Sequence, residues 1–379
     1  MQSHKDKDDV VSPTEVTNLS AKAGRNMAMM ELLAAELRRD PEIEMSISLR
    51  KIQREIDPPK KPRAPLPIKM SFRERLVTGP KTLEIVFPLS KAVTTLLDGY
   101  QDSHLAGKKH ALASALQNMI AASTILWERD LCGAVLKFND EIAAKIVWGS
   151  TSHTEYSSLQ YLEAHAPGLP VPRPHGLIKF SNQLIMFMTY IPTTTLQTAW
   201  RNLTAENKLS IQDSLQSYFV TLRSLKMPLG HNMGGVRGEG VQDFHMVEHK
   251  PQLLKTMLEF EDWQFSVDED KHPPSRAFTT FLRNFLPPSS NECVFTHGDL
   301  RPANIMVKQN AESNYIISGI IDWEMSGFYP EYVESMQVLH LFNRHDESDW
   351  YHYLPHCISP ARHPERFLVG RIWDTSLGF

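Results

Sequence analysis

The fold is decided by the stretch from residue 293 to residue 324. It reads Cys293-Val-Phe-Thr-His297-Gly-Asp299-Leu-Arg-Pro-Ala-Asn304-Ile-Met-Val-Lys308, continues through a polar turn, and ends Tyr315-Ile-Ile-Ser-Gly-Ile-Ile-Asp322-Trp-Glu324. Short β-prone runs alternate here with polar turns, which predicts a strand, a loop and then a two-stranded hairpin. We therefore expect two carboxylates and one amide, those of Asp299, Asp322 and Asn304, at strand ends that the hairpin brings together.

These three polar groups suit one kind of chemistry. Phosphoryl transfer needs a carboxylate that orients the attacking hydroxyl and accepts its proton, and oxygen ligands for the magnesium on the nucleotide phosphates. The spacing of His297, Asp299 and Asn304 is that of the kinase catalytic loop H-R-D-x-x-x-x-N, with Gly298 in place of arginine. Such residues also gather in ordinary turns. The preceding strand, the following hairpin and the terminal D-W-E make coincidence a poor explanation.

The sequence H-G-D-L-R-P-A-N followed by I-I-D-W-E resembles the aminoglycoside phosphotransferase family, which is choline-kinase-like and part of the protein-kinase-like superfamily. The stretch from Gly327 to Tyr332 is similar to what fungal members place there. The resemblance implies Asp299 as catalytic base, His297 as the residue that braces the loop, and Asn304 and Asp322 as magnesium ligands. Glu324 is a weaker candidate for the metal shell. The implied cofactors are ATP and Mg²⁺.

Two earlier residues resemble the kinase pair that holds the nucleotide phosphates. Lys145 lies in the apolar run from 141 to 147, a predicted strand, and Glu155 stands at the start of a predicted helix over 154–164. In kinases a strand lysine contacts the α- and β-phosphates and a helix glutamate holds it. The alternative is a solvated edge lysine and a surface glutamate.

The segment Met188-Thr-Tyr190-Ile is the predicted hinge between two lobes, and Met188 and Tyr190 are the predicted adenine contacts. The phosphate-covering loop departs from the kinase pattern. It should be rich in glycine so that backbone N–H groups approach the phosphates, yet residues 129–135 contain only Gly133. This departure bears on activity more than on fold.

The order of elements predicts an α+β, protein-kinase-like fold with a small antiparallel-sheet N-lobe and a larger helical C-lobe. Hairpins are expected over 133–147 and 175–190, and helices over 27–39, 108–123 and 205–226. We expect residues 1–70 to form a tail, a short helix and a proline-rich linker, with disorder up to about residue 24. Residues 71–126 are a predicted helical extension, 127–190 the N-lobe and 191–379 the C-lobe.

Composition narrows the list of partners. The net charge of −4 is spread along 379 residues, so neither nucleic acid nor a membrane surface is expected as a partner. Three isolated cysteines favour a reducing compartment and no disulfide framework. No apolar run reaches the length of a membrane span, and we expect a cytoplasmic protein. The proline-rich segment 57–67 could serve a protein partner of the SH3 type.

Two other motifs compete for a function. His245-Met-Val-Glu248-His249 matches the inverted zincin pattern H-x-x-E-H, but the glycines before it and Pro251 after it disfavour the helix that zinc binding requires. The acidic stretch from Asp346 to Asp349 could hold a cationic acceptor, although a solvated turn is the simpler interpretation.

We therefore expect an ATP-dependent phosphotransferase whose acceptor is a hydroxyl of a small molecule. The alternative is a pseudokinase, a nucleotide-binding or scaffold protein without catalytic activity, which the single glycine of the phosphate loop favours.

Overall fold

The computed structural model describes residues 21–41, 43, 45, 48, 49, 51, 52, 71–78, 81–101, 108–129, 132–149, 152–242, 252–266, 276–288, 292–339 and 348–377. The chain divides into two units between Lys69 and Met70. In the first unit, helix α1 spans Ala21–Arg39, and Glu36 Oε1 accepts a hydrogen bond from Lys51 Nζ at 3.0 Å. The helix begins before Met27 and takes in the end of the tail that we expected to be disordered, because alanine and lysine favour helix.

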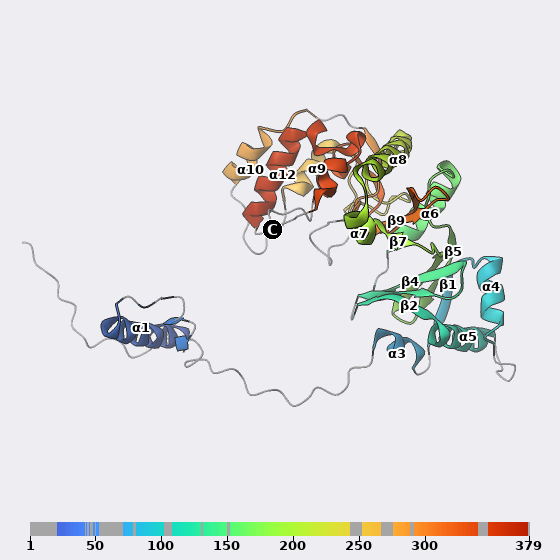
Figure 1. Ribbon diagram of the computed structural model, residues 1–379, viewed down its shortest axis with the longest axis horizontal. Helices are drawn as coiled ribbons and strands as arrows, with labels where there is room; N and C mark the ends of the chain where they lie inside the picture. The colour runs from blue at the N-terminus through green and yellow to red at the C-terminus, as the bar shows by residue number, and fades with distance from the viewer. Residues whose placement is uncertain are drawn as a thin grey trace, which may run out of the picture. The chain divides into compact units, whose positions relative to one another are not determined.

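The second unit begins with a lobe built around one antiparallel sheet of six strands, in the order β1-β5-β6-β4-β3-β2. The elements are α3 (Phe72–Val77), β1 (Leu83–Phe87), α4 (Lys91–Asp98), α5 (Lys108–Ala122), β2 (Thr124–Arg129), β3 (Gly133–Lys137), β4 (Ile142–Trp148), α6 (Thr154–His165), β5 (Pro174–Phe180) and β6 (Gln183–Thr189). Figure 1 shows α3, α4 and α5 around this sheet.

Alternation of side chains along the strands divides the buried residues of the sheet between two cores. On β6, Ile185 and Phe187 pack with residues of α3, α4 and α5. Leu184 and Met186 belong instead to the large core that includes α6 and the second lobe. The sheet is thus covered on both faces.

Both predicted hairpins are confirmed, since β3 pairs with β4 and β5 with β6. The turn between β3 and β4 is fixed by Asn139, whose Oδ1 accepts hydrogen bonds from the backbone N–H groups of Glu141 and Ile142. The predicted helical extension over 71–126 omits a strand, because Leu83–Phe87 pairs with β5 at the edge of the sheet. Five residues carry too little periodicity to reveal a strand whose partner lies far along the chain.

The second lobe is mainly helical, with two small antiparallel sheets, β10-β9-β7 and β11-β8. Its elements are β7 (Thr194–Thr195), α7 (Leu196–Ala199), η1 (Trp200–Asn202), α8 (Ala205–Ser224), α9 (Met257–Gln264), α10 (Arg276–Arg283), β8 (Cys293–Thr296), η2 (Pro302–Asn304), β9 (Ile305–Gln309), β10 (Tyr315–Ile320), β11 (Gly327–Pro330), α11 (Val333–Gln337), η3 (Asp349–Tyr353), η4 (His356–Ile358), η5 (Pro360–Arg362) and α12 (Pro364–Leu377). The loops β8–β9 and β10–β11 carry the site residues that were predicted for this lobe.

Several segments named in the sequence analysis lie outside the described residues: the N-terminal twenty residues, the proline-rich stretch 57–67 and the motif from His245 to His249. The same holds for residues 130 and 131 of the expected phosphate loop and for Asp346 and Glu347 of the acidic stretch. Among the helices of the described ranges, none combines the length and the apolar character that crossing a bilayer demands. The three cysteines are free thiols.

Helix α8 supplies a matched test of this packing. Leu215 is fully buried on the stripe that faces the large core, whereas Leu209 on the same helix is 50% exposed. Leu215→Ala is expected to lower the free energy of unfolding by about 2–5 kcal/mol, because it leaves a cavity. Leu209→Ala should change it by less than about 0.5 kcal/mol. Urea titration of both variants measures the difference, and equal losses would show that α8 does not pack as described.

Candidate active site

The predicted lysine and acids meet at one point. The ammonium of Lys145, on β4, donates to Glu155 Oε2 at 2.8 Å, to Asp322 Oδ1 at 2.5 Å and to Glu324 Oε2 at 2.8 Å. Glu155 comes from the first turn of α6, and the other two acids come from the β10–β11 loop. One cation therefore joins β4 and α6 to a loop that lies almost 180 residues further along the chain. The solvated-surface interpretation of the Lys145–Glu155 pair is wrong, because both side chains are largely buried.

Burial disfavours the charge of Lys145, but the three carboxylates outweigh it and hold the pKa of the lysine well above its usual value. Glu155 lies at the other extreme, because burial raises its pKa to about 7 against the opposing effect of Lys145. The pKa of Asp322 is lowered, since Lys145 outweighs the effect of burial. The lowered pKa keeps Asp322 ionised beside the lysine.

The β10–β11 loop holds Asp322 in an unusual backbone conformation. Asp322 has φ of 68°, in the left-handed region that side chains other than glycine seldom adopt. Neighbouring contacts fix it: Ile321 N–H donates to Asn304 O at 2.9 Å, and Trp323 N–H donates to Glu155 Oε1 at 3.2 Å. Glu155 therefore holds both Lys145 and the backbone beside Asp322.

The β8–β9 loop brings Asp299 and Asn304 together as the spacing predicted. Asn304 Nδ2 donates to the backbone oxygen of Asp299 at 2.9 Å and to its Oδ2 at 2.8 Å. Arg301 Nε forms an ion pair with the same Oδ2 at 3.2 Å. Partial burial raises the pKa of Asp299, while Arg301 opposes the rise.

His297 is fully buried and braces this loop. Its Nδ1 accepts a hydrogen bond from Asp299 N–H at 3.1 Å, so Nε2 carries the proton and donates to Ile321 O at 3.1 Å. Burial lowers the pKa of His297 to about 4. The neutral ring therefore ties the loop of Asp299 to the loop of Asp322.

Glu334, on α11, holds the β8–β9 loop through contacts that the sequence did not reveal. It is fully buried, and its Oε2 and Oε1 accept hydrogen bonds from His297 N–H at 2.6 Å and Gly298 N–H at 3.3 Å. Burial raises its pKa to about 7. The sequence offered one sign of this burial. Glu334 stands four residues before the apolar Val338, so the two share one face of a short helix, and both are buried.

Gly298 explains why glycine replaces the arginine of the kinase motif. Its φ is +83°, and a Cβ added there would lie 2.6 Å from Met325 O. A side chain would meet both backbone strain and a collision with the loop that carries Asp322.

The nucleotide lobe shows where Tyr190, Met188 and Gly133 lie. The Tyr190 N–H donates to Glu141 O at 2.7 Å, so it is not free to bind adenine, and the Tyr190 ring lies under Lys137 Nζ at 4.5 Å. Met188 lies in β6 and pairs with Ala143. Gly133 begins β3, where a side chain would collide with Ile146 O on the neighbouring strand. Strand packing is therefore a sufficient reason for this glycine.

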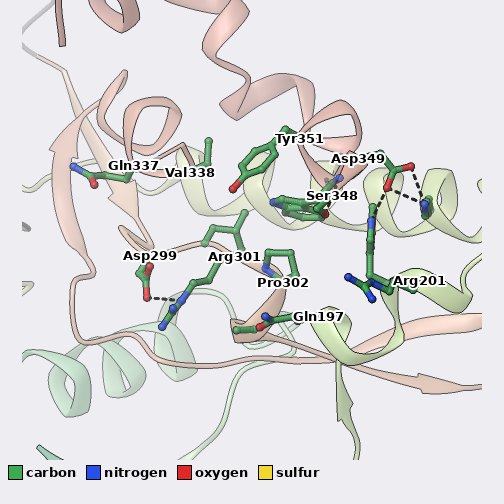
Figure 2. Close-up of a pocket in the computed structure, with 15 residues that line it drawn as sticks. Gln197, Arg201, Asp299, Arg301, Pro302, Gln337, Val338, Ser348, Asp349 and Tyr351 are labelled. Carbon is green, nitrogen blue, oxygen red and sulfur yellow. Dashed lines mark hydrogen bonds and ion pairs between the residues drawn. The ribbon is translucent and has the colours of Figure 1, made fainter. Parts of the chain in front are cut away.

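A cavity of 740 Å³ opens beside Asp299, between the β8–β9 loop and the elements α7, η1, α8 and η3. Figure 2 shows Asp299 and Arg301 toward one end and Asp349 toward the other. The side chain of Asp349 is 45% exposed, but the protein holds it, because it accepts hydrogen bonds from Trp200 Nε1 at 2.7 Å and from Lys208 Nζ at 2.8 Å. The volume is in the range of small-molecule sites, roughly 300–1,000 Å³.

The acids also suit a divalent cation. Oxygens of Glu155, Asp322 and Glu324 lie within 4.8 Å of one another, and carboxylate and amide oxygens are the ligands that Mg²⁺ prefers. Three carboxylates against the single charge of Lys145 leave negative charge in excess. Asp322 and Glu324 fit the role of metal ligands, and Glu155 completes this acid group. Asn304, whose Nδ2 donates to Asp299, stays a predicted ligand.

Fold and site together define a two-lobed, protein-kinase-like protein. The family model described as the phosphotransferase enzyme family (APH) matches residues 145–363, which is more than half of the chain. The chain therefore belongs to that family. No curated protein matches it.

Solved structures of aminoglycoside phosphotransferases are similar to this chain at low identity. One is a thermostable mutant of APH(4)-Ia in complex with ADP and hygromycin B, with 14% identity, a TM-score of 0.42, and coverage of 67% of this chain and 83% of that one. Another is APH(3'')-Id from Streptomyces rimosus, with 14% identity, a TM-score of 0.39, and coverage of 67% of this chain and 92% of that one.

The buried, neutral His297 predicts a pH dependence of stability. Its folded pKa of about 4 lies below the ordinary value of 6.5, so the unfolded chain binds a proton first. The contribution of His297 to the free energy of unfolding is therefore fully present above about pH 6.5, and it falls by about 3 kcal/mol as the pH drops to 4. In His297→Asn this contribution is absent. Urea unfolding of both proteins across the window measures the difference in slope, and equal slopes would contradict the prediction.

Gly298 can be tested against a glycine with the same backbone conformation in open space. Gly149 has φ of +67° and nothing within 4 Å of an added Cβ. Gly149→Ala should therefore lower the free energy of unfolding by about 1–2 kcal/mol, which is the cost of placing alanine in the left-handed conformation. Gly298→Ala adds the collision with Met325 O and is expected to cost about 2–5 kcal/mol in total. Thermal or urea unfolding compares them, and equal costs would exclude the collision.

Proposed function

We propose that the protein transfers the γ-phosphoryl group of ATP to a hydroxyl of a small molecule. The observation that carries the proposal is the Lys145 ammonium held among Glu155, Asp322 and Glu324, with the Asp299–Asn304 pair on the adjoining loop. Membership of the phosphotransferase enzyme family supports the same reaction class.

Each residue has a definite task in the proposed reaction. Lys145 binds the phosphates, and Glu155 keeps its ammonium in place. Asp299 orients the acceptor hydroxyl, whose oxygen forms a bond to the γ-phosphorus while the bond from that phosphorus to the bridging oxygen breaks and ADP leaves. The hydroxyl proton passes to Asp299. Mg²⁺, held by Asn304 and Asp322 with Glu324, would neutralise the charge on the phosphates.

The 740 Å³ cavity supports a small-molecule acceptor, because Asp299 lies in its wall. A hydroxyl bound there reaches the base without crossing the protein. Positioning and charge neutralisation supply most of the rate in such reactions.

The rival function is a nucleotide-binding pseudokinase or scaffold. The single glycine of the phosphate loop favours it. The intact Lys145–Glu155 pair and the paired Asp299 and Asn304 oppose it.

Two substitutions separate these functions. Asp299→Asn is expected to lower turnover by about 10²–10⁴-fold because the base is lost, and to leave binding of Mg·ATP nearly unchanged. In Asp322→Ala the stabilisation by Mg·ATP should disappear. The wild-type stabilisation amounts to about 2.7 kcal/mol at about 100 times Kd.

The measurements are melting temperatures with ATP alone, Mg²⁺ alone and both, together with ADP release in a screen of hydroxylated metabolites. A Mg²⁺-dependent shift without ADP release from any acceptor favours the pseudokinase. Loss of nucleotide binding in Asp299→Asn equal to its loss of turnover would sink the assignment of Asp299 as the base.

A further inference from the structure

The cavity beside Asp299 has a charge pattern that bears on the acceptor. Among the described residues of its lining, three are cationic, namely Arg201, Lys208 and Arg301, and two are acidic, Asp299 and Asp349. An acceptor that carries several positive charges would need carboxylates that are not already paired. Which of the five charges can bind a ligand depends on which of them are already paired within the protein.

Asp349 is already neutralised by the protein. Lys208 Nζ donates to both of its carboxylate oxygens, at 2.9 and 2.8 Å, and Trp200 Nε1 donates to Oδ1 at 2.7 Å. The lysine is itself held, since its Nζ lies 4.8 Å from the centre of the Trp200 ring. This aromatic-backed pair has no net charge left for a cationic guest.

At the other end of the cavity, Arg301 is occupied by Asp299 at 3.2 Å. Arg201, in η1, has no ion-pair or hydrogen-bond partner in the part of the chain that the structure describes. Figure 2 shows Arg201 at the same end of the cavity as Asp349, away from Asp299. After internal pairing, the charge left over in the described lining is the single positive charge of Arg201.

The remaining lining is aromatic and rich in donors. Trp200 and Trp350 meet edge to face at 5.3 Å, and Tyr351 projects over the cavity in Figure 2. The indole N–H of Trp350 has no hydrogen-bond acceptor within the described ranges. Such walls suit a flat apolar body, and the free hydrogen-bonding capacity of Arg201 suits an anion.

We propose that the acceptor is a hydroxylated compound with an aromatic or other flat apolar body and one carboxylate, which Arg201 binds while the hydroxyl lies at Asp299. The inference rests on the proposed function, because it names the substrate class of the same site. Polycationic amines fit the described lining poorly: Arg201 repels them, and Lys208 already occupies Asp349, the described acid at that end of the cavity. Arg201 then determines specificity and takes no part in the chemical step.

The test measures binding without nucleotide, so that it does not depend on catalysis. Three matched probes share one ring and one hydroxymethyl group: para-hydroxymethylbenzoate, its carboxamide, and para-hydroxymethylbenzylamine. Isothermal titration calorimetry of the full chain should give the tightest binding for the carboxylate and the weakest for the amine. Arg201→Gln should weaken binding of the carboxylate by about tenfold and leave binding of the carboxamide nearly unchanged. Arg276→Gln, an exposed arginine on α10 outside the cavity, is the matched control and should leave all three unchanged.

Three results would overturn the inference: tighter binding of the amine than of the carboxylate, equal losses for carboxylate and carboxamide in Arg201→Gln, or no binding of the carboxylate at about 10 mM. Failure of the proposed function has a different signature. There the carboxylate still binds through Arg201, but neither a Mg·ATP-dependent melting shift nor ADP release is observed.

Discussion

The structure depends on one ammonium group and the three carboxylates around it. Lys145 is fixed by the pairing of β4 within the sheet, Glu155 by the first turn of α6, and Asp322 and Glu324 by a loop of the second lobe. Burying charges costs free energy unless they are paired, and here the pairing is uneven, with three acids to one base. Removing Lys145 would leave like charges facing one another in a poorly solvated space. A divalent cation would relieve the same imbalance, so the geometry that joins the lobes also suits the proposed magnesium ion.

The catalytic loops are held mainly through backbone groups. His297 ties Asp299 N–H to Ile321 O, Glu334 accepts two backbone N–H groups of the β8–β9 loop, and Gly298 allows the two loops to approach. Asp322 pays the conformational cost of a left-handed backbone, which is tolerated where the surroundings over-determine it. These constraints place Asp299 and Asp322 before any ligand arrives. Such preorganisation matters for phosphoryl transfer, because the protein contributes position and charge more than covalent chemistry.

The sequence could predict contacts between residues that are close along the chain, but not those between residues that are far apart. One strand–loop–hairpin unit contains His297, Asp299, Asn304 and Asp322, so their spacing alone predicted that they lie close together. Lys145 and Glu155 needed a resemblance to kinases, because nothing local distinguishes them from a surface pair. Glu334 was missed since its partners are amide groups, which leave no mark in the sequence. Asp349 was misjudged as a turn residue for a similar reason: Lys208 and Trp200 lie about 140 residues earlier. The edge strand β1 was too short to show a period.

The two halves of the site are built from different parts of the fold, and this separates reaction from specificity. The phosphate side of the proposed site depends on β4, α6 and the loops that carry Asp299 and Asp322, whereas the 740 Å³ cavity is also lined by α7, η1, α8, α11 and η3. Only the β8–β9 loop belongs to both. Substitutions in the elements that line the cavity can therefore change its charge without disturbing Lys145, and one fold can support many acceptors in this way. In this chain, Asp349 is the acid best placed to receive a cationic group, and Lys208 neutralises it from within. Because Lys208 is part of α8, whose inward face also carries the buried Leu215, the charge of the cavity is anchored to the core of the second lobe.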